Sequence, residues 1–367
     1  MAPLPKTMKA IQLKSFNAPY AVSRVPVPRP EPHQLLIRVR AAGFCHTDCM
    51  VNEGAFDSPL PVIGSHEPAG VVIEVGAEVQ GFKEGDCVGC INFEGACGKC
   101  PDCKAGRPVY CDNMLMKGIT TDGAWAEYMV ADWRFTVKIP YAMSYPVVAC
   151  LMCAGISIYG GIKRAAVPPG GSIGIVGIGG LGHIGTQLAK AMGYKVVAID
   201  VKQSALDLAA SYPLKPDLAI LATTPAPDAV SQIAQVVGGA YPGLDATVLA
   251  TDAPAAFKFA AAVTRKHGTL VLLGQPDAGI TMSYKDVIFR DLTLVGSLVA
   301  SREDTEELLG LVAEHGVEVK MKEWRIEQAE EMRQEYLGGK GEGKNVVVFG
   351  RCDNKRPPFT CLVHSSS

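Results

Sequence analysis

Residues Gly171 to Asp200 read GSIGIVGIGGLGHIGTQLAKAMGYKVVAID. The stretch joins an apolar strand, Ile173–Val176, to a helix pattern that runs through Ala191 and then to a second strand that ends at Asp200. Between the first strand and the helix the glycines follow the pattern Gly-x-Gly-x-x-Gly, which lets the backbone approach a pyrophosphate at the helix amino terminus. A motif in this setting predicts a dinucleotide-binding βαβ unit.

The predicted cofactor contacts in this unit are Gly177, Gly179, Gly182 and Asp200. A carboxylate at the end of the second strand binds the adenosine ribose hydroxyls and repels a 2′-phosphate, so NAD is favoured over NADP. Lys202 stands two residues further on and weakens that argument, which keeps NADP as the alternative. An acid merely exposed at a strand end is the competing interpretation of Asp200.

The pattern of the rest of the chain predicts an α/β protein with two parts. The first 150 residues are β-rich, with short apolar runs between Gly and Pro turns at Leu35–Val39, Gly70–Val75 and Cys87–Ile91. Beyond Gly171 strands alternate with helices, which predicts a doubly wound parallel sheet. The further strands expected are Ala219–Ala222, Ala246–Ala250, Thr269–Leu273, Leu292–Val295 and Asn345–Phe349, and helices are expected from Cys153 to Ala166 and over Ser301–His315.

Composition excludes several classes of protein. The chain has 367 residues, of which 48% are hydrophobic and 20% charged, with 35 basic against 37 acidic side chains and a net charge of −2. This balance argues against intrinsic disorder and against a nucleic-acid or anionic-membrane surface. The most apolar stretches are short or interrupted, so no membrane span is expected. The segment Met1–Ala10 lacks an apolar core, so a cytoplasmic address is expected.

Four of the twelve cysteines are clustered in GACGKCPDCKAGRPVYC, as Cys97, Cys100, Cys103 and Cys111. The spacing C-x2-C-x2-C-x7-C suits four thiolates around one Zn²⁺, and a site with all four positions filled is structural. Iron–sulfur ferredoxins share the first part of the pattern, but their fourth cysteine follows after three residues. Two disulfides are the other interpretation, which the expected reducing compartment disfavours.

A second set of metal-binding residue types is scattered along the chain. Cys45 lies in GFCHTDC, His66 and Glu67 lie in GSHEPAG, and Cys153 lies in LMCAG. If Cys45, His66 and Cys153 meet in space, they form a Cys₂His site with one open position, the pattern of a catalytic zinc. Each residue taken alone is more often a small core side chain.

In motif content and motif order the chain resembles the zinc-dependent alcohol dehydrogenases of the medium-chain dehydrogenase/reductase superfamily. The matching segments are GFCHTD, GSHEPAGVV, VGAEVQGFKEGDCV, the four-cysteine stretch, LMCAGISIYGGIK, GIGGLGHIG and VGSLVASREDT. The resemblance implies a GroES-like catalytic domain, formed by residues 1–155 and 297–367, around a Rossmann domain at residues 156–296. It also implies two zinc ions per chain and assembly as a homo-oligomer, a dimer or a tetramer.

The resemblance also implies roles for single residues. Cys45, His66 and Cys153 match the catalytic zinc ligands, Glu67 a nearby acid that can approach the metal, and Asp48 the carboxylate that orients the ligating histidine. Thr47 matches the hydroxyl that bonds the substrate oxygen and begins the proton exit. The remaining matches are to cofactor contacts: His46, Gly180, Leu181 and Lys344, the last as a basic residue near the phosphates. Phe56, Asn92, Phe93 and Val299 are expected in the walls of the substrate cleft.

The chain also departs from many relatives. The position of a proton-relay histidine is taken by Met50, which cannot carry a proton, and Ser65 replaces the usual glycine before His66. The stretch from Val201 to Thr224 is shorter than in many relatives, which predicts that one strand–helix unit of the Rossmann domain is trimmed. His183 receives no role.

The function expected is interconversion of an alcohol with an aldehyde or ketone, by hydride transfer with NAD(H), on a small-molecule substrate. The absence of the relay histidine inclines the expectation towards carbonyl reduction. Two alternatives stay open: a zinc-free enoyl or quinone reductase of the same superfamily, and a non-catalytic NAD-binding protein with a structural zinc.

Overall fold

The glycine-rich loop joins the central strand of a six-stranded parallel sheet to the helix that follows it. The computed structural model describes residues 4–141, 143–339 and 341–350, so the tail from Arg351 to Ser367 lies outside the described residues. The strand order is β13-β12-β11-β14-β15-β16, and every neighbouring pair is parallel. This is the Rossmann order of a doubly wound sheet.

The elements of this Rossmann sheet lie close to the predicted ranges. Its strands are β11 (Ser172–Val176), β12 (Lys195–Asp200), β13 (Leu218–Leu221), β14 (Leu244–Leu249), β15 (Thr264–Leu272) and β16 (Thr293–Gly296). Its helices are α5 (Gly182–Ala191), α6 (Gln203–Ser211), α7 (Ala226–Val237), α8 (Pro254–Val263) and α9 (Tyr284–Ile288). Every residue of β11 is buried, because helices cover both faces of the sheet.

The strand–helix unit that was predicted to be trimmed is present in a short form. Residues 201–224 contain both α6 and β13, and β13 pairs with β12 over Leu218–Leu221. The stretch is short because the helix has nine residues and the strand four, with only short connections between them. The unit is therefore shortened and not lost.

The β-rich part is organised around a seven-stranded sheet of order β10-β6-β5-β3-β18-β17, in which β9 also pairs with β3. A three-stranded sheet of order β2-β1-β4 and the two-stranded β7-β8 accompany it. The strands are β1 (Thr7–Leu13), β2 (Ala21–Pro26), β3 (Gln34–Phe44), β4 (Val62–Ile63), β5 (Pro68–Val75), β6 (Cys87–Cys90), β7 (Phe93–Glu94), β8 (Leu115–Met116), β9 (Tyr128–Asp132), β10 (Thr136–Lys138), β17 (Met321–Trp324) and β18 (Lys344–Val348).

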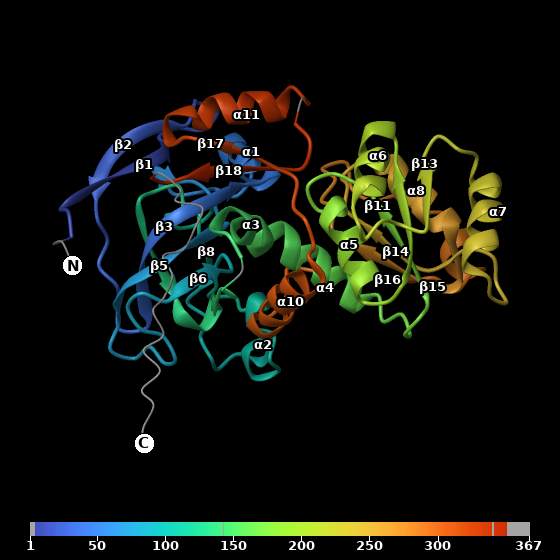
Figure 1. Ribbon diagram of the computed structural model, residues 1–367, viewed down its shortest axis with the longest axis horizontal. Coiled ribbons are helices and arrows are strands. Elements are labelled where there is room, and N and C mark those ends of the chain that lie inside the picture. The colour runs from blue at the N-terminus through green and yellow to red at the C-terminus, as the bar shows by residue number, and fades with distance from the viewer. Residues whose placement is uncertain (1–3, 142, 340, 351–367) are drawn as a thin grey trace, which may run out of the picture.

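The chain leaves this part and returns to it after the Rossmann sheet. Strand β18 pairs antiparallel with the end of β3, so residues near both ends of the described chain share one sheet. Figure 1 shows α11, β17 and β18 in red beside the blue strands, α10 beside α4, and the Rossmann sheet to the right of them. The helices here are α1 (His46–Glu53), α2 (Pro101–Lys104), α10 (Arg302–His315) and α11 (Ala329–Leu337), with short 3₁₀ turns η1 (Pro108–Tyr110), η2 (Trp133–Phe135) and η4 (Ile326–Gln328).

One long helix connects the two parts. It consists of α3 (Tyr145–Cys150), a π-helical segment η3 (Leu151–Gly155) and α4 (Ile156–Arg164). Among the described residues it is the one helix long and apolar enough to cross a membrane, but 78% of its most apolar 18-residue stretch is buried inside the protein. It is therefore the core helix of the fold, and the expected domain boundary at residues 155 and 156 falls inside it.

Candidate active site and metal centres

Four side chains from three distant segments converge at the junction of the two parts. One ligand atom each from Cys45, His66, Glu67 and Cys153 lies within 4.8 Å of the others. His66 Nε2 and Cys153 Sγ are 3.3 Å apart. Cys45 follows the last residue of β3, His66 and Glu67 precede β5, and Cys153 lies in η3. The structure thus brings together the residues predicted to hold the catalytic metal.

Asp48 fixes the backbone of two of these segments. Its Oδ2 accepts a hydrogen bond from Cys45 N at 2.8 Å, and its Oδ1 accepts one from Ser65 N at 2.9 Å. Asp48 was expected to orient the ligating histidine, and among the described residues His66 Nδ1 has no hydrogen-bond partner. Both carboxylate oxygens are aligned with main-chain donors instead, so Asp48 orients the histidine through the peptide that precedes it.

The π-helical segment gives Cys153 its direction. Its neighbours Leu151, Met152, Ala154 and Gly155 are buried in the core, whereas Cys153 is partly exposed at the cluster. A π-helical turn inserts an extra residue into the helix and changes which side chain faces a given side. Such segments are frequent at functional sites.

The electrostatics of the cluster favour a bound cation. A hydrogen bond from the Cys153 thiol holds the pKa of Cys45 well below its usual range, and the same bond raises the pKa of Cys153. Burial lowers the pKa of His66, but the bond to Cys45 and the neighbouring negative charges outweigh it and raise that pKa to about 9. A metal ion would displace these protons, because thiols and imidazole bind metals in their deprotonated forms.

Glu67 forms a buried ion pair with Lys344. Lys344 Nζ lies 2.6 Å from Glu67 Oε1 and donates a second bond to Phe44 O at 2.8 Å. Burial raises the pKa of Glu67 to about 7 against the opposing effect of Lys344. Lys344 was expected beside the cofactor phosphates. Its aliphatic stem does lie against the loop, because a Cβ placed on Gly180 would be 3.2 Å from Lys344 Cδ. Its ammonium group, however, faces Glu67.

The first turn of α1 carries the other predicted catalytic and cofactor residues of this region. Thr47 Oγ1 lies 3.6 Å from Cys45 Sγ. His46 is exposed, and its ring centroid lies 6.1 Å from that of Tyr336 in α11. Met50 is one helical turn from His46 and shares its face of the helix.

The second predicted metal cluster also forms. The sulfur atoms of Cys97, Cys100, Cys103 and Cys111 lie within 4.8 Å of one another. Backbone N–H groups point at the sulfurs, as Cys100 N does at Cys97 Sγ over 3.3 Å. Backbone bonds from Lys99 and Cys100 lower the pKa of Cys97 to about 6. All ten cysteines among the described residues are free, which contradicts the disulfide alternative for these four.

The cofactor loop has the shape that the motif requires. Gly177 has a φ of +90°, and a Cβ on Gly182 would overlap the carbonyl oxygen of Gly177. Gly179 is exposed, and a Cβ there would meet no atom within 4 Å, so the loop has an open side. Leu181 is partly buried against the core that lies between the sheet and α5. These positions leave room for a group on the helix amino terminus.

Asp200 contacts this loop directly. Its Oδ2 accepts a bond from Ile178 N at 2.6 Å, and its Oδ1 accepts one from Lys202 N at 2.8 Å. The carboxylate therefore lies beside the loop at the end of β12, while the Lys202 side chain is exposed.

His183 has a structural function that sequence reasoning missed. Its Nδ1 donates to Gly179 O at 2.8 Å, and its Nε2 accepts from Lys320 N at 3.2 Å. Burial lowers the pKa of His183 to about 4, so the ring is neutral and both nitrogens are bonded. The signal in the sequence was its place directly after the last glycine of the motif.

Two of the four expected cleft-wall residues share one apolar cluster. Phe93 and Val299 pack in the same small core, although Val299 is β-branched and has a φ of +50°. Asn92 is buried beside Phe93, whereas Phe56 packs in the separate core of the β-rich part.

Comparisons with known proteins agree with this geometry. Two family models match, the alcohol dehydrogenase GroES-like domain over residues 31–141 and the zinc-binding dehydrogenase over residues 180–314. The chain is 36% identical over 345 residues to an alcohol dehydrogenase of Rhizobium meliloti (strain 1021), covering 93% of this chain and 98% of that protein. The chain belongs to the zinc-type, medium-chain alcohol dehydrogenases.

Other members of this alcohol dehydrogenase family are similarly close. One from Geobacillus stearothermophilus is 35% identical over 342 residues, 93% of this chain and 99% of the relative. The crystal structure of the alcohol dehydrogenase from Aeropyrum pernix superposes with a TM-score of 0.82 at 29% identity, covering 93% of this chain and all of that one. The predicted GroES-like and Rossmann parts are thus those of an alcohol dehydrogenase.

Proposed function

We propose that this alcohol dehydrogenase uses zinc and NAD(H) to interconvert an alcohol and an aldehyde or ketone. The convergence of Cys45, His66 and Cys153 carries the proposal, because two thiols and an imidazole are the ligand set of a catalytic zinc with one position left for substrate. Bound Zn²⁺ would acidify an alcohol or polarise a carbonyl, and NAD would accept or supply the hydride.

The residues present fit such an ion. Two buried polar atoms at the cluster, His66 Nδ1 and Glu67 Oε2, have no hydrogen-bond partner among the described residues. Glu67 faces the cluster while Lys344 balances its charge, so the total charge of the site stays low when thiolates form. Thr47 stands at the edge of the cluster, where its hydroxyl would bond the substrate oxygen and pass a proton outwards.

NAD is the preferred cofactor in this proposal and NADP the less favoured one. Asp200 lies beside the loop at the place where a ribose would bind, and its charge opposes a 2′-phosphate. The residues that would hold the cofactor are His46, Gly177, Gly179, Gly180, Leu181, Gly182, Asp200 and Lys202. Lys344 would support the loop through its stem against Gly180, because its charge is on Glu67. A second zinc at Cys97, Cys100, Cys103 and Cys111 would be structural, because four thiolates leave no position for substrate.

The proposal extends to substrate direction and assembly. Met50 offers no proton path at the next turn of α1, which favours carbonyl reduction. A group of exposed apolar side chains lies on α9 and along the β16 edge: Tyr284, Ile288, Phe289, Leu294 and Leu298. An exposed apolar sheet edge is a place where chains associate, which supports a homo-oligomer.

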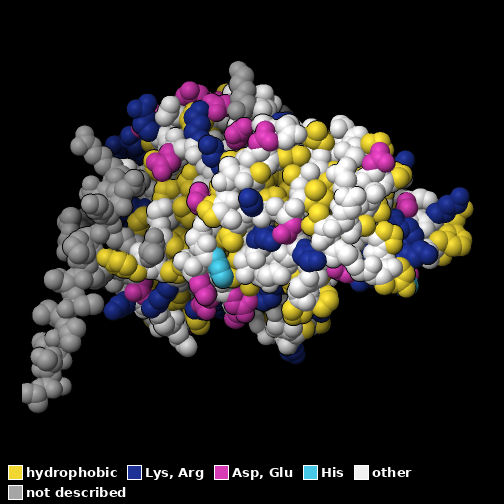
Figure 2. Space-filling model, turned by 45° about the vertical axis from the view of Figure 1, so that its right-hand side comes forward, with side chains coloured by type: hydrophobic (Ala, Val, Ile, Leu, Met, Phe, Trp, Pro, Cys, Tyr) yellow, Lys and Arg dark blue, Asp and Glu magenta, His cyan; other side chains and the backbone are white. Residues whose placement is uncertain are grey.

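The surface charge of the protein bears on its location and partners. Basic and acidic side chains are interspersed on the face in Figure 2, and the net charge is −2, which supports a small-molecule substrate and no nucleic acid or membrane partner. The protein would be cytoplasmic. Residues 156–296 would form the cofactor domain, and residues 1–155 and 297–367 the catalytic domain.

The test is an NADH absorbance assay in both directions over aliphatic, benzylic and furanic substrates, combined with metal analysis. Cys45→Ser and Cys153→Ser should abolish turnover and leave NADH affinity unchanged. Turnover that persists in both variants would contradict a catalytic zinc. A metal content of one zinc per chain without turnover would favour a non-catalytic protein, and no zinc would favour an enoyl or quinone reductase.

A further inference from the structure

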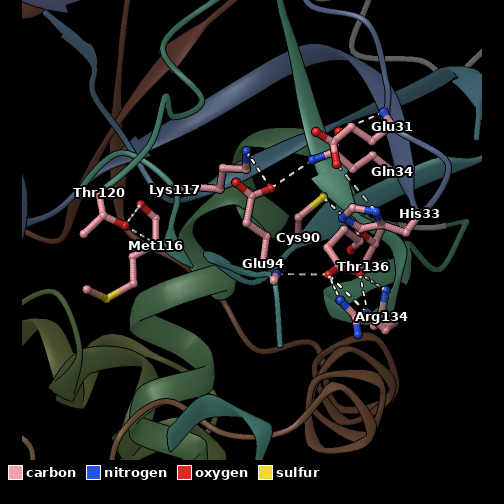
Figure 3. A network of polar contacts seen from close by, with 12 residues as sticks. Glu31, His33, Gln34, Cys90, Glu94, Met116, Lys117, Thr120, Arg134 and Thr136 are labelled. Carbon is pink, nitrogen blue, oxygen red and sulfur yellow. Dashed lines mark hydrogen bonds and ion pairs between the residues drawn. The ribbon is translucent and has the colours of Figure 1, made fainter. Parts of the chain in front are cut away.

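A buried ion pair lies at the stem of the four-cysteine lobe, which we define as residues 95–114 between β7 and β8. Lys117 Nζ is 2.8 Å from Glu94 Oε2, and the two side chains are only 5% and 8% exposed. Gln34 Nε2 donates a second bond to the same carboxylate oxygen at 3.2 Å (Figure 3). Taking both charges out of water is costly, so a buried pair is weak evidence for a gain in stability. Its location suggests a different task.

On one side the pair is attached to the lobe. Glu94 is the last residue of β7, and the next residue, Gly95, donates from its backbone to Asp132 Oδ2 at 3.3 Å. Arg134, which is paired with Asp132, donates from Nη1 to Ala96 O at 2.9 Å. The chain therefore enters the lobe at a point fixed to the seven-stranded sheet.

On its other side the pair leads to the metal ligand His66. Lys117 N donates to Asn92 O at 2.7 Å, and Lys117 begins the turn that carries Gly118. Gly118 has a φ of +72° and lies so close to Ser65 that a Cβ would overlap the carbonyl of Ser65. This turn and the peptide before His66 are thus in direct contact.

The same turn holds that peptide a second time. Gly123 also lacks room for a Cβ against Ser65 O, and Ala124 N donates to that oxygen at 2.9 Å. Trp125 N donates to Gly64 O at 3.0 Å. Ser65 itself has a φ of +69°, a conformation that a non-glycine residue adopts only where its surroundings hold it. Residues 117–125 therefore determine the position of the peptide that precedes His66.

We infer that Glu94 and Lys117 are positioning residues for the metal ligand His66. The pair ties the turn that holds Ser65 to the stem of the four-cysteine lobe, so the position of one cysteine cluster influences the geometry of the other. The ring of His66 lies 3.3 Å from Cys153 Sγ, and a shift of its peptide would change that approach directly. The inference rests on the proposed metal at Cys45, His66 and Cys153.

The experiment uses the full chain with Co²⁺ in place of Zn²⁺. The difference between each protein and its Cys153→Ser counterpart isolates the visible absorption of the Cys45–His66–Cys153 cluster. Lys117→Met and Glu94→Gln should each shift this band and release the ion to a chelator about tenfold faster, since residues behind metal ligands commonly change metal affinity by that order. Because the two residues act as a pair, the double variant should be no worse than either single one.

The matched control is Lys138→Met, which removes an exposed lysine of the same sheet from its pair with Asp86. It should leave the band and the release rate unchanged. If Lys117→Met does not fold, Glu94→Gln carries the test, because it keeps the shape of the side chain. A lower melting temperature with an unchanged cobalt band would make the pair merely structural and overturn the inference, as would additive effects in the double variant. A wild-type protein without any band that depends on Cys153 would instead overturn the proposed function.

Discussion

Lys344 and Glu67 form an ion pair of 2.6 Å with side chains that are 5% and 0% exposed, and this pair joins the metal cluster to the cofactor loop. The lysine approaches from β18, with its stem against Gly180 and its charge on the acid beside His66. Strand β18 belongs to the sheet that holds Cys45, since it pairs with the end of β3. The two halves of the proposed reaction site are therefore connected through one buried charge pair.

Lys344→Met should destabilise the protein in a pH-dependent way. The variant leaves Glu67 buried without a counter-charge, and breaking a buried pair on one side costs roughly 3–5 kcal/mol. Burial already raises the pKa of Glu67 to about 7, and loss of the lysine raises it further. A carboxyl with a raised folded pKa contributes stability at low pH that is lost as the pH rises through that value. Urea unfolding at pH 5.5 and pH 8 should therefore show the larger loss at pH 8.

The control for this experiment is Lys322→Met, which breaks an exposed pair with Glu335. It should cost at most about 1 kcal/mol at either pH. An equal loss at both pH values for Lys344→Met would contradict the buried charge at Glu67.

Gly179→Ala and Gly182→Ala should separate cofactor binding from folding. A methyl at Gly179 meets nothing within 4 Å in the protein, so the melting temperature should stay unchanged while the Kd for NADH rises at least about tenfold. A methyl at Gly182 would overlap Gly177 O, so this variant should lose stability. Calorimetry and NADH fluorescence titration measure both quantities, and unchanged NADH affinity in Gly179→Ala would show that the cofactor does not use this loop.

Because neutral His183 stabilises the fold, the free energy of unfolding should fall at acidic pH. Its folded pKa of about 4 lies below its unfolded value, so its stabilising effect is complete above pH 6.5 and is lost as the pH falls towards 4. Protonation would place a proton on Nε2 against the N–H of Lys320. Wild-type protein should lose up to about 3 kcal/mol over this window. His183→Gln, less stable at neutral pH, should show a shallower slope in denaturant unfolding from pH 7 to pH 4.5, and parallel slopes would refute the assignment.

Asp200→Asn should relax the choice of cofactor. The amide keeps an acceptor for Ile178 N but removes the charge that repels a 2′-phosphate, and Lys202 is exposed nearby. The ratio of NADPH to NADH affinity should rise about tenfold, which corresponds to about 1.4 kcal/mol. Asp207→Asn on the exposed face of α6 is the control, and a ratio that responds equally in both variants would argue against Asp200 as the determinant.

Local patterns were enough to predict the parts of the site that form within one stretch of chain. The glycine loop and the four-cysteine cluster each lie within a few turns, so residue type and spacing specify them. The short strand–helix unit at residues 201–224 could also be predicted from the length of the stretch, which holds a helix of nine residues and a strand of four.

Contacts between distant segments could not be predicted from spacing. Cys45, His66 and Cys153 were grouped by residue type, but only the family resemblance implied that they meet, since the turns and the π-helical segment that orient them leave no periodic signal. The direction of the Lys344 side chain depends on β18 pairing with β3, which places it beside Glu67. Glu94 and Lys117 lie at the two ends of the four-cysteine lobe and form an ion pair with each other. Nothing in the sequence around these two charged residues predicts that contact.

The most direct measurement of the central claim is anomalous X-ray diffraction from a crystal at the zinc absorption edge. The account predicts two peaks per chain, one among Cys97, Cys100, Cys103 and Cys111 and one bounded by Cys45, His66 and Cys153. A single peak at the four cysteines, in a crystal grown with zinc present, would contradict metal-assisted chemistry at the second cluster.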